Sequence, residues 1–340
     1  MPSRYRIPIR LFDRRTMLKA TGAVLAGTAA GLGCDSLDIP PPVDPGPLPG
    51  ISPQADFYLQ SCCGTPDVDP ETFTMDVEDA DGAVLATIDQ QYVLGLTGQQ
   101  KEHTLQCIGS NPRFLFVDNA MWTGLPFRDL LDDLGVTVPA DAVELVFWCV
   151  DGYDVSIPIT DLDTPIWLVW EMNEEPLTRP HGAPFRFLVP GRYGTKNPKW
   201  CERLVFATEP HTGFWEREGW SNEAAYRPNA LTLSPAAYAV VGEGTIRIQG
   251  SAFAGLDPVT RVEWTEDDGA SWQDAEITYT SENEHTWRLW SVDFTPPEPG
   301  TYKIRTRVTT ESGAMSADTP DGTNRFLGFD GGMEITLEVT

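Results

Sequence analysis

The sequence has 340 residues, of which 41% are hydrophobic and 22% charged, so it is globular rather than disordered and long enough for more than one domain. Its formal net charge of −26 excludes a general electrostatic attraction to nucleic acid or to anionic lipid. The same charge is explained by solubility alone or, more specifically, by attraction to a basic protein partner such as an electron carrier.

The N-terminus has the pattern of an export signal. Arg14 and Arg15 are followed by a weakly apolar stretch rich in Gly and Ala over residues 20–33. This stretch is too short and too rich in Gly for a stable membrane span. Residues 1–34 are therefore predicted to be a twin-arginine signal, which places the chain in the periplasm or cell envelope. Such signals are typical of proteins that fold around a cofactor before export.

A lipid anchor is predicted at the end of this segment. Residues 31–34 resemble a lipoprotein cleavage site with Cys34 as the lipidated residue, although Gly31 stands where Leu is usual. Residues 35–50 are rich in Pro and Asp and have no apolar periodicity, so they are predicted to form an extended tether.

Residues 51–230 are predicted to form an α+β domain. Phe73, Met75 and Val77 alternate on one face of an expected strand. Strands are expected at 72–77, 143–150, 167–170 and 185–189, and a helix at 126–134. Strands separated by loops and short helices indicate a layered α+β structure.

Residues 231–340 have a different pattern, which predicts an all-β domain. Polar and apolar residues alternate at 245–249, 261–264, 302–308 and 335–339, with turn residues between them. About seven short strands in roughly 100 residues favour an immunoglobulin-like sandwich. This domain has no cluster of His, Cys and carboxylate residues, so a structural or association role is expected for it.

Six cysteines occur, at positions 34, 62, 63, 107, 149 and 201, and none forms a C-x-x-C motif. A zinc ribbon and a c-type haem site are therefore excluded. Adjacent Cys62 and Cys63 form a poor disulfide candidate on geometric grounds. Cys149 and Cys201 are either a disulfide pair in an oxidising compartment or buried free thiols, and their spacing does not decide between the two.

Cys107 is the first candidate for chemistry. It ends a mixed stretch and enters a loop of Gly, Ser, Asn and Pro at 109–112. A thiolate at the end of a strand is well placed to bind a soft metal or to act as a nucleophile. The alternative is a buried structural cysteine.

A basic cluster in an acidic chain is the second candidate. One His and four cations surround two Gly turns, namely His181, Arg186, Arg192, Lys196 and Lys199. Glycine allows close backbone approach and basic side chains bind phosphate oxygens, so an anion site is predicted here. The alternative is a basic surface loop. Phosphate-loop, dinucleotide and hydrolase motifs are absent from the sequence, and a Cys107–His181 dyad stays as a minor alternative.

Several ordered motifs make the chain resemble the sulfite oxidase family of molybdopterin-dependent oxidoreductases. The resemblance extends over residues 51–340 and is carried by segments 105–109, 122–126, 171–173, 181–186, 190–200, 214–217, 261–264 and 269–275. It implies a sulfite-oxidase-type molybdopterin-binding domain followed by the immunoglobulin-like domain through which the family dimerises. A homodimer is therefore implied, although a monomer is not excluded.

The resemblance also implies roles for individual residues. Cys107 would be the single protein ligand to molybdenum, because a thiolate suits that soft centre. Trp122 would form the wall of the pocket near the metal. The pterin and its phosphate would be bound by His181, Arg186, Lys196 and Lys199, with Asp151 and Cys62 as further pterin contacts. The implied chemistry is oxygen-atom transfer on a small molecule, with electrons exchanged with an external carrier such as a cytochrome c, and both the oxidase and the reductase direction stay open.

The chain differs from sulfite-oxidising members of the family at the positions that would bind the substrate. Sulfite-oxidising members have Arg-Asn-His where this chain has Gln60-Ser61-Cys62, paired arginines where it has residues 110–113, and Tyr where it has Trp220. A desolvated dianion needs cationic partners, and Arg113 is the candidate to replace one of them. The departures favour a less charged S-oxide, N-oxide or organic substrate. The alternative from another class is a cofactor-free, lipid-anchored binding or scaffold protein that keeps the fold.

Overall fold

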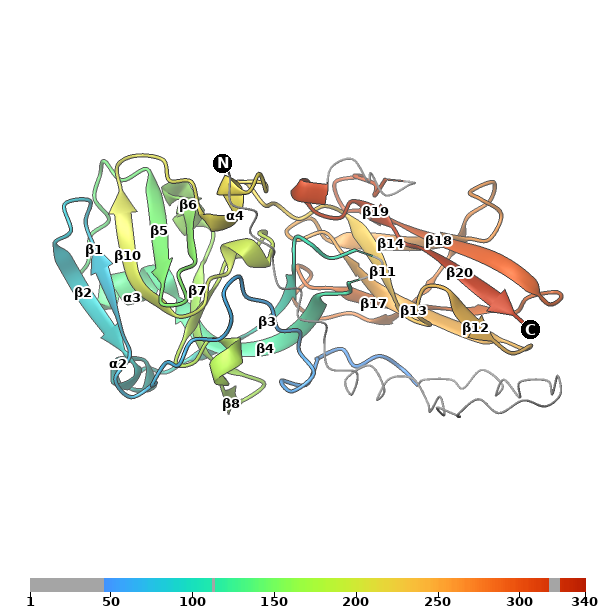
Figure 1. Ribbon diagram of the computed structural model, residues 1–340, viewed down its shortest axis with the longest axis horizontal. Coiled ribbons are helices and arrows are strands. Elements are labelled where there is room, and N and C mark those ends of the chain that lie inside the picture. Colours follow the sequence, from blue (N-terminus) through green and yellow to red (C-terminus); the bar gives the residue numbers. More distant parts are fainter. Residues whose placement is uncertain (1–45, 112–113, 318–324) are drawn as a thin grey trace, which may run out of the picture. The chain divides into compact units, whose positions relative to one another are not determined.

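The computed structural model describes residues 46–111, 114–317 and 325–340 (Figure 1). The predicted signal, Cys34 and most of the tether lie outside these ranges, as does Arg113. The described residues belong to one compact unit. Among the described residues there is no helix whose length and hydrophobicity would let it cross a membrane.

The first sheet has the order β2-β1-β10-β5-β6, and its strands lie side by side in Figure 1. Its strands are β1 (Thr74–Glu78), β2 (Val84–Asp89), β5 (Glu144–Cys149), β6 (Asp154–Pro158) and β10 (Cys201–Ala207). β1 and β10 are parallel, whereas the other pairs are antiparallel. Phe73, Met75 and Val77 are buried together, as their alternation predicts.

The second sheet carries the cysteine of interest. It contains β3 (Gln99–Gln106), β4 (Val117–Pro126), β7 (Trp167–Met172) and β8 (Glu175–Pro176) in that order, and β9 (Arg186–Leu188) pairs with β7. β3 ends with Gln106 opposite Val117. Cys107 therefore leaves the sheet at the end of a strand, as predicted, and the Cys107 N–H donates to Phe116 O at 2.9 Å.

Short helices connect these strands. They are α2 (Gln90–Leu94), α3 (Phe127–Asp133), η1 (Ile159–Asp163), η2 (Arg179–His181), η3 (Gly194–Lys196) and α4 (Phe214–Arg217). α3 confirms the helix predicted at 126–134. The rings of Phe127 and Phe147 pack edge-on against Phe187, with centroids 5.2 Å and 5.0 Å away, so α3 and both sheets share one core.

The second domain is a sandwich of two five-stranded sheets. One sheet contains β11 (Asn229–Ser234), β13 (Ile246–Phe253), β16 (Glu276–Tyr279), β17 (Arg288–Phe294) and β19 (Gly331–Gly332). The other contains β12 (Ala239–Val241), β14 (Val259–Thr265), β15 (Gln273–Asp274), β18 (Gly300–Thr310) and β20 (Glu334–Val339), and η4 (Arg325–Leu327) precedes β19.

The predicted fold class, α+β followed by a β-sandwich, is confirmed. Seven sandwich strands have four or more residues, which matches the expected seven. The remaining three, β12, β15 and β19, have only two or three residues, too few for periodicity to reveal. The division at residues 230 and 231 stays a prediction.

Hydrogen bonds join the end of β3 to the second domain. The amides of Gln106 and Asn229 are buried and bond reciprocally, at 3.1 Å and 3.2 Å. Tyr226 Oη also accepts from Gln106 N, and Thr104 Oγ1 accepts from Trp287 N at 2.9 Å. The residues that position Cys107 are thus held from the sandwich side.

We expect Asn229→Leu to lower the free energy of unfolding by about 2 kcal/mol, because it leaves the buried Gln106 amide without its partner. Chemical denaturation followed by tryptophan fluorescence measures the loss. Gln99→Leu, a comparable change at an exposed position, serves as the control. Equal stabilities for the two variants would contradict the prediction.

Candidate functional site

Cys107 lies in a pocket beside the loop that follows β3. Its Sγ accepts a hydrogen bond from Gly109 N at 3.4 Å, and Ser110 N donates to Cys107 O. Burial raises the pKa of the Cys107 thiol, and the Gly109 N–H opposes that rise. The thiol is therefore protonated until a cation replaces the proton, as metal ligation does.

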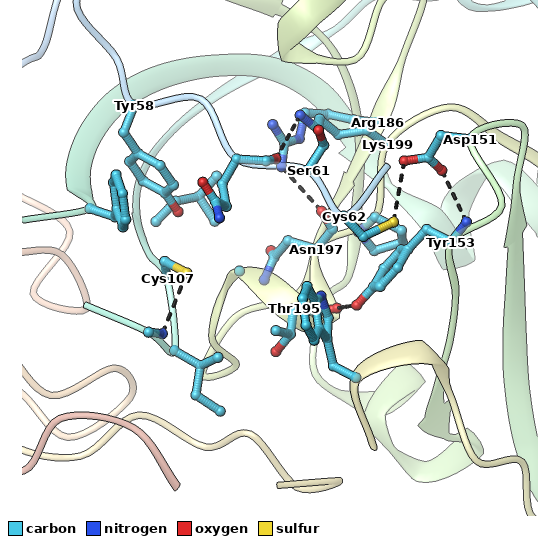
Figure 2. A pocket seen from close by; sticks show the side chains of 18 of the residues that line it. Tyr58, Ser61, Cys62, Cys107, Asp151, Tyr153, Arg186, Thr195, Asn197 and Lys199 are labelled. Carbon is cyan, nitrogen blue, oxygen red and sulfur yellow. Dashed lines mark hydrogen bonds between the residues drawn. The ribbon is translucent and has the colours of Figure 1, made fainter. Parts of the chain in front are cut away.

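The pocket brings together seven of the residues proposed from the sequence (Figure 2). They are Cys62, Cys107, Asp151, His181, Arg186, Lys199 and Trp220. Figure 2 shows Cys107 on one side of the pocket and Asp151 on the other. A ligand that touches both must therefore extend across the pocket.

Arg186, on β9, is buried in one wall. Its Nη1 donates to His181 O and its Nη2 to Asn197 O, both at 3.1 Å. Its guanidinium lies 5.5 Å from the centroid of the Trp122 ring. Burial lowers the Arg186 pKa to about 10, so the side chain stays charged at neutral pH.

Lys199 supplies a second cation to the same pocket. Its Nζ donates to Gln60 O at 3.0 Å and Pro180 O at 2.8 Å. Burial, together with the nearby Arg186 charge, lowers the Lys199 pKa to about 7. A bound anion would favour the charged ammonium and raise that pKa again.

His181 is neutral and is held by the backbone. Its Nε2 lies 2.9 Å from Gln54 O, a carbonyl acceptor, so Nε2 must carry the proton. Burial and the Arg186 charge lower the His181 pKa to about 4. Gly182 follows with φ +108°, and a Cβ there would lie 3.0 Å from Arg186 Cβ. Because glycine has no Cβ, the turn formed by His181 and Gly182 can pack closely against Arg186.

The far side of the pocket is formed by Asp151, Cys62 and Tyr153. Cys62 Sγ donates to Asp151 Oδ2 at 3.8 Å, and Asp151 Oδ1 accepts from Tyr153 N at 3.2 Å. Tyr153 Oη donates to Thr195 O. Burial raises the Asp151 pKa, so a ligand amine or amide donor at this side would stabilise the carboxylate.

The pocket fits a molybdopterin cofactor. Arg186 Nε and Thr195 Oγ1 are buried, line the pocket and have no hydrogen-bond partner among the described residues. At Gly194 a Cβ would lie 3.2 Å from Tyr58 Oη, so the pocket is narrow there. Unused donors, two cations and a thiol form the donor set that a phosphate-bearing ligand with a soft metal requires.

Trp122 and Lys196, for which the resemblance implies roles at the cofactor, are not among the residues that line this pocket. Trp122 is fully buried beneath Arg186, and its indole N–H donates to His103 O at 3.1 Å. Lys196 Nζ is enclosed by Glu216 Oε1 at 2.6 Å, Ser156 O at 2.8 Å and Asn222 Oδ1 at 3.0 Å. Its charge is already neutralised, so it has no donor left for phosphate.

Sequence reasoning missed four polar residues of the pocket, which are Tyr58, Tyr153, Thr195 and Asn197. Thr195 and Asn197 lie within the basic run 190–199, whose spacing could have indicated them. Tyr58 and Tyr153 reach the pocket only through tertiary contacts and had no local signal. Arg113, the proposed cation for substrate, lies outside the described residues.

Lys196→Met should lower the stability of the protein, whereas Lys199→Met should lower its ligand content. The first leaves buried Glu216 unpaired and should destabilise the protein by about 3 kcal/mol. The second should leave stability nearly unchanged and lower the content of the bound anionic ligand. Thermal denaturation and phosphate analysis of the purified protein separate the two effects. A stable Lys196→Met protein that has lost its ligand would contradict this assignment.

Two family models match the chain. Residues 63–215 match the oxidoreductase molybdopterin binding domain, and residues 223–316 match the Mo-co oxidoreductase dimerisation domain. The first match contains Cys107 and the basic side chains of the pocket, and the second includes the sandwich strands from β11 to β18.

Similar proteins include mitochondrial sulfite oxidases. The chain is 26% identical to that of Drosophila melanogaster over an alignment 289 positions long, which covers 71% of this chain and 50% of the fly protein. It is 25% identical to that of Mus musculus over an alignment 314 positions long, which covers 79% of this chain and 58% of the mouse protein. The chain thus spans between half and three fifths of these relatives.

A solved structure shows the same fold. The sulfane dehydrogenase SoxCD from Paracoccus pantotrophus superposes with a TM-score of 0.68 at 19% identity, over 79% of this chain and 75% of that one. At this identity the likeness supports the fold alone. It includes both the pocket domain and part of the sandwich, because either domain by itself would be a smaller share of the chain.

Proposed function

The chain belongs to the sulfite oxidase family of molybdopterin-binding oxidoreductases, and from that premise we propose that it is a molybdenum-dependent oxidoreductase. The observation that supports this most is the composition of one pocket. Cys107, with a hydrogen-bond donor aimed at its sulfur, shares that pocket with Arg186 Nε and Thr195 Oγ1, which have no partner among the described residues.

The side chains divide the work of holding the cofactor. Cys107 would bind the metal, while Arg186, Lys199 and Thr195 would donate to phosphate and pterin. Asp151 would accept from the pterin on the opposite side. When bound, the cofactor supplies oxygen-atom transfer and the uptake or release of two electrons. The protein contributes binding, orientation and the exclusion of water.

The metal content of the protein tests this proposal. The full chain, purified from a host that makes the cofactor, should contain about one molybdenum per chain. Cys107→Ser should lose the metal while keeping much of the pterin, because the basic side chains still bind it. Elemental analysis and the fluorescence of extracted pterin measure the two separately.

Cys63→Ser is the matched control, since Cys63 is exposed and does not line the pocket. It should retain both molybdenum and pterin. A folded wild-type protein that contains neither would instead support the alternative, a cofactor-free binding or scaffold protein.

We further propose that the substrate is a neutral oxide or organic molecule rather than sulfite. Among the described lining residues, the only Lys and Arg are Lys199 and Arg186, and both are assigned to the cofactor. Near Cys107 the described lining includes the Trp220 ring and the Tyr58 hydroxyl, both uncharged: a Cβ at Gly109 would lie 3.8 Å from both Cys107 Sγ and the Trp220 ring, and one at Gly194 would lie 3.2 Å from Tyr58 Oη and 3.8 Å from Cys107 Cα. A sulfite dianion placed here would lose its hydration without gaining, among the described residues, a cation that is not already assigned to the cofactor.

Steady-state kinetics with redox dyes should show a kcat/KM for dimethyl sulfoxide or trimethylamine N-oxide that is at least about tenfold higher than the kcat/KM for sulfite. The reason is that desolvating a charge without a cationic partner costs more free energy than a tenfold difference in kcat/KM represents. Trp220→Ala should raise KM for the preferred substrate, whereas Trp148→Ala on the exposed surface should not. Rapid sulfite turnover that is abolished in Arg113→Ala would overturn the proposal.

We also propose the setting in which the enzyme works. The twin arginines and the segment up to Cys34 support export to the cell envelope and a lipid anchor. The net charge of −26 favours a basic electron carrier, such as a cytochrome c, as the external redox partner. The match of residues 223–316 to a dimerisation domain supports a homodimer.

A further inference from the structure

Two buried cysteines lie opposite each other in the first sheet, next to the pocket. Cys149 ends β5 and Cys201 begins β10, and the two are direct partners in this antiparallel pair. Their Sγ atoms are 3.5 Å apart, within sulfur hydrogen-bond distance. The two side chains are 5% and 2% exposed and belong to the core of the first domain.

This arrangement satisfies the geometric needs of a disulfide. Directly opposed residues of antiparallel strands have Cα atoms about 4.5 to 5.5 Å apart. Disulfides require a Cα separation of about 4.4 to 6.8 Å. The two sulfurs are already in contact, so side-chain rotation brings them to bonding distance without moving the strands. The strands stay joined beyond the pair by Val150 N, which donates to Trp200 O at 3.0 Å.

We propose that Cys149 and Cys201 form a structural disulfide bond when the chain folds under oxidising conditions. The two S–H bonds break, one S–S bond forms, and two protons and two electrons leave the pair. A disulfide donor, such as the oxidised form of a thiol–disulfide oxidoreductase, accepts them and becomes a dithiol.

The fold explains when this bond would form. β10 lies between β1 and β5, so an external disulfide donor cannot reach Cys201 once the sheet is complete. The hydrogen bond with the Cys201 thiol, together with burial, also raises the pKa of Cys149, which leaves little thiolate in the folded protein. A chain that folds before it meets a disulfide donor would therefore keep both thiols, whereas a chain that folds in the presence of one would form the bond before β10 is inserted, and the bond would then resist reductants.

The bond would join the two chain segments that line the far side of the pocket. Asp151 follows Cys149 by two residues and Lys199 precedes Cys201 by two, and both line the pocket. The closed loop contains His181 and Arg186 as well. If the proposed function holds, the disulfide limits the unfolded states of the segment that binds the cofactor.

Peptide mapping tests the bond directly. The full chain is produced in a cofactor-making bacterial host with an oxidising cytoplasm and, in parallel, in its parent with a reducing cytoplasm. Free thiols are trapped with iodoacetamide in denaturant, and the digest is analysed by mass spectrometry. We expect a linked Cys149–Cys201 peptide from the oxidising host and two alkylated peptides from the reducing host. Two alkylated peptides from both hosts would overturn the proposal.

Thermal denaturation gives an independent test. The oxidised preparation should melt roughly 5 to 10 °C above the reduced one. In the oxidising host, Cys149→Ala and Cys201→Ala should each remove this difference, and the double variant should lose little more, because either change breaks the same bond. The exposed Cys63→Ala should keep the difference. Fully additive losses, or equal melting of the two wild-type preparations, would overturn the proposal.

Neither test depends on molybdenum. A linked peptide in a protein without metal would support the disulfide while contradicting the proposed function. Alkylated cysteines in a metal-loaded protein would do the reverse.

Discussion

A buried guanidinium without a carboxylate partner is the constraint on which the pocket depends. Arg186 is 7% exposed, and no carboxylate among the described residues pairs with it. Isolated buried charges are strongly unfavourable. The protein offsets this with two backbone carbonyls and the face of Trp122, yet Nε stays unused. An anionic ligand would bind the donor that is left. The positive φ of Gly182 shapes the turn so that the carbonyl of His181 accepts a hydrogen bond from the guanidinium.

Lys196 shows the opposite solution a few residues away. Glu216 pairs with its ammonium in the interior, and the pair leaves no charge for a ligand. Both lysines of the basic run are partly or wholly buried, but only Lys199 has carbonyls rather than a carboxylate as its partners. The presence or absence of a neutralising carboxylate thus separates a structural cation from a ligand-binding one.

The two domains meet where Cys107 is positioned. The reciprocal amide pair of Gln106 and Asn229 is buried, so the residue before the cysteine is held by the sandwich. The sandwich therefore contributes to the geometry of the pocket. Asn229 is thereby linked to Cys107 through Gln106, the residue that precedes the cysteine.

The sequence by itself determined the periodic and local features of this protein. Alternation placed Phe73, Met75 and Val77 on one buried face, helical spacing located α3, and turn spacing indicated the sandwich. The cysteine at a strand end and the run of basic residues indicated the site, and the family motifs identified its cofactor. These features depend on neighbours along the chain, which the sequence shows directly.

Only the tertiary structure decided which of those residues face the pocket. In the folded protein Trp122 lies beneath Arg186, and Lys196 pairs with Glu216. Tyr58 and Tyr153 line the pocket. It also placed Cys149 against Cys201, a choice that spacing left open. The physical reason is that the environment of a charge or a thiol is set by side chains far away in the sequence, and the cost of burying it depends on whether one of them is a partner.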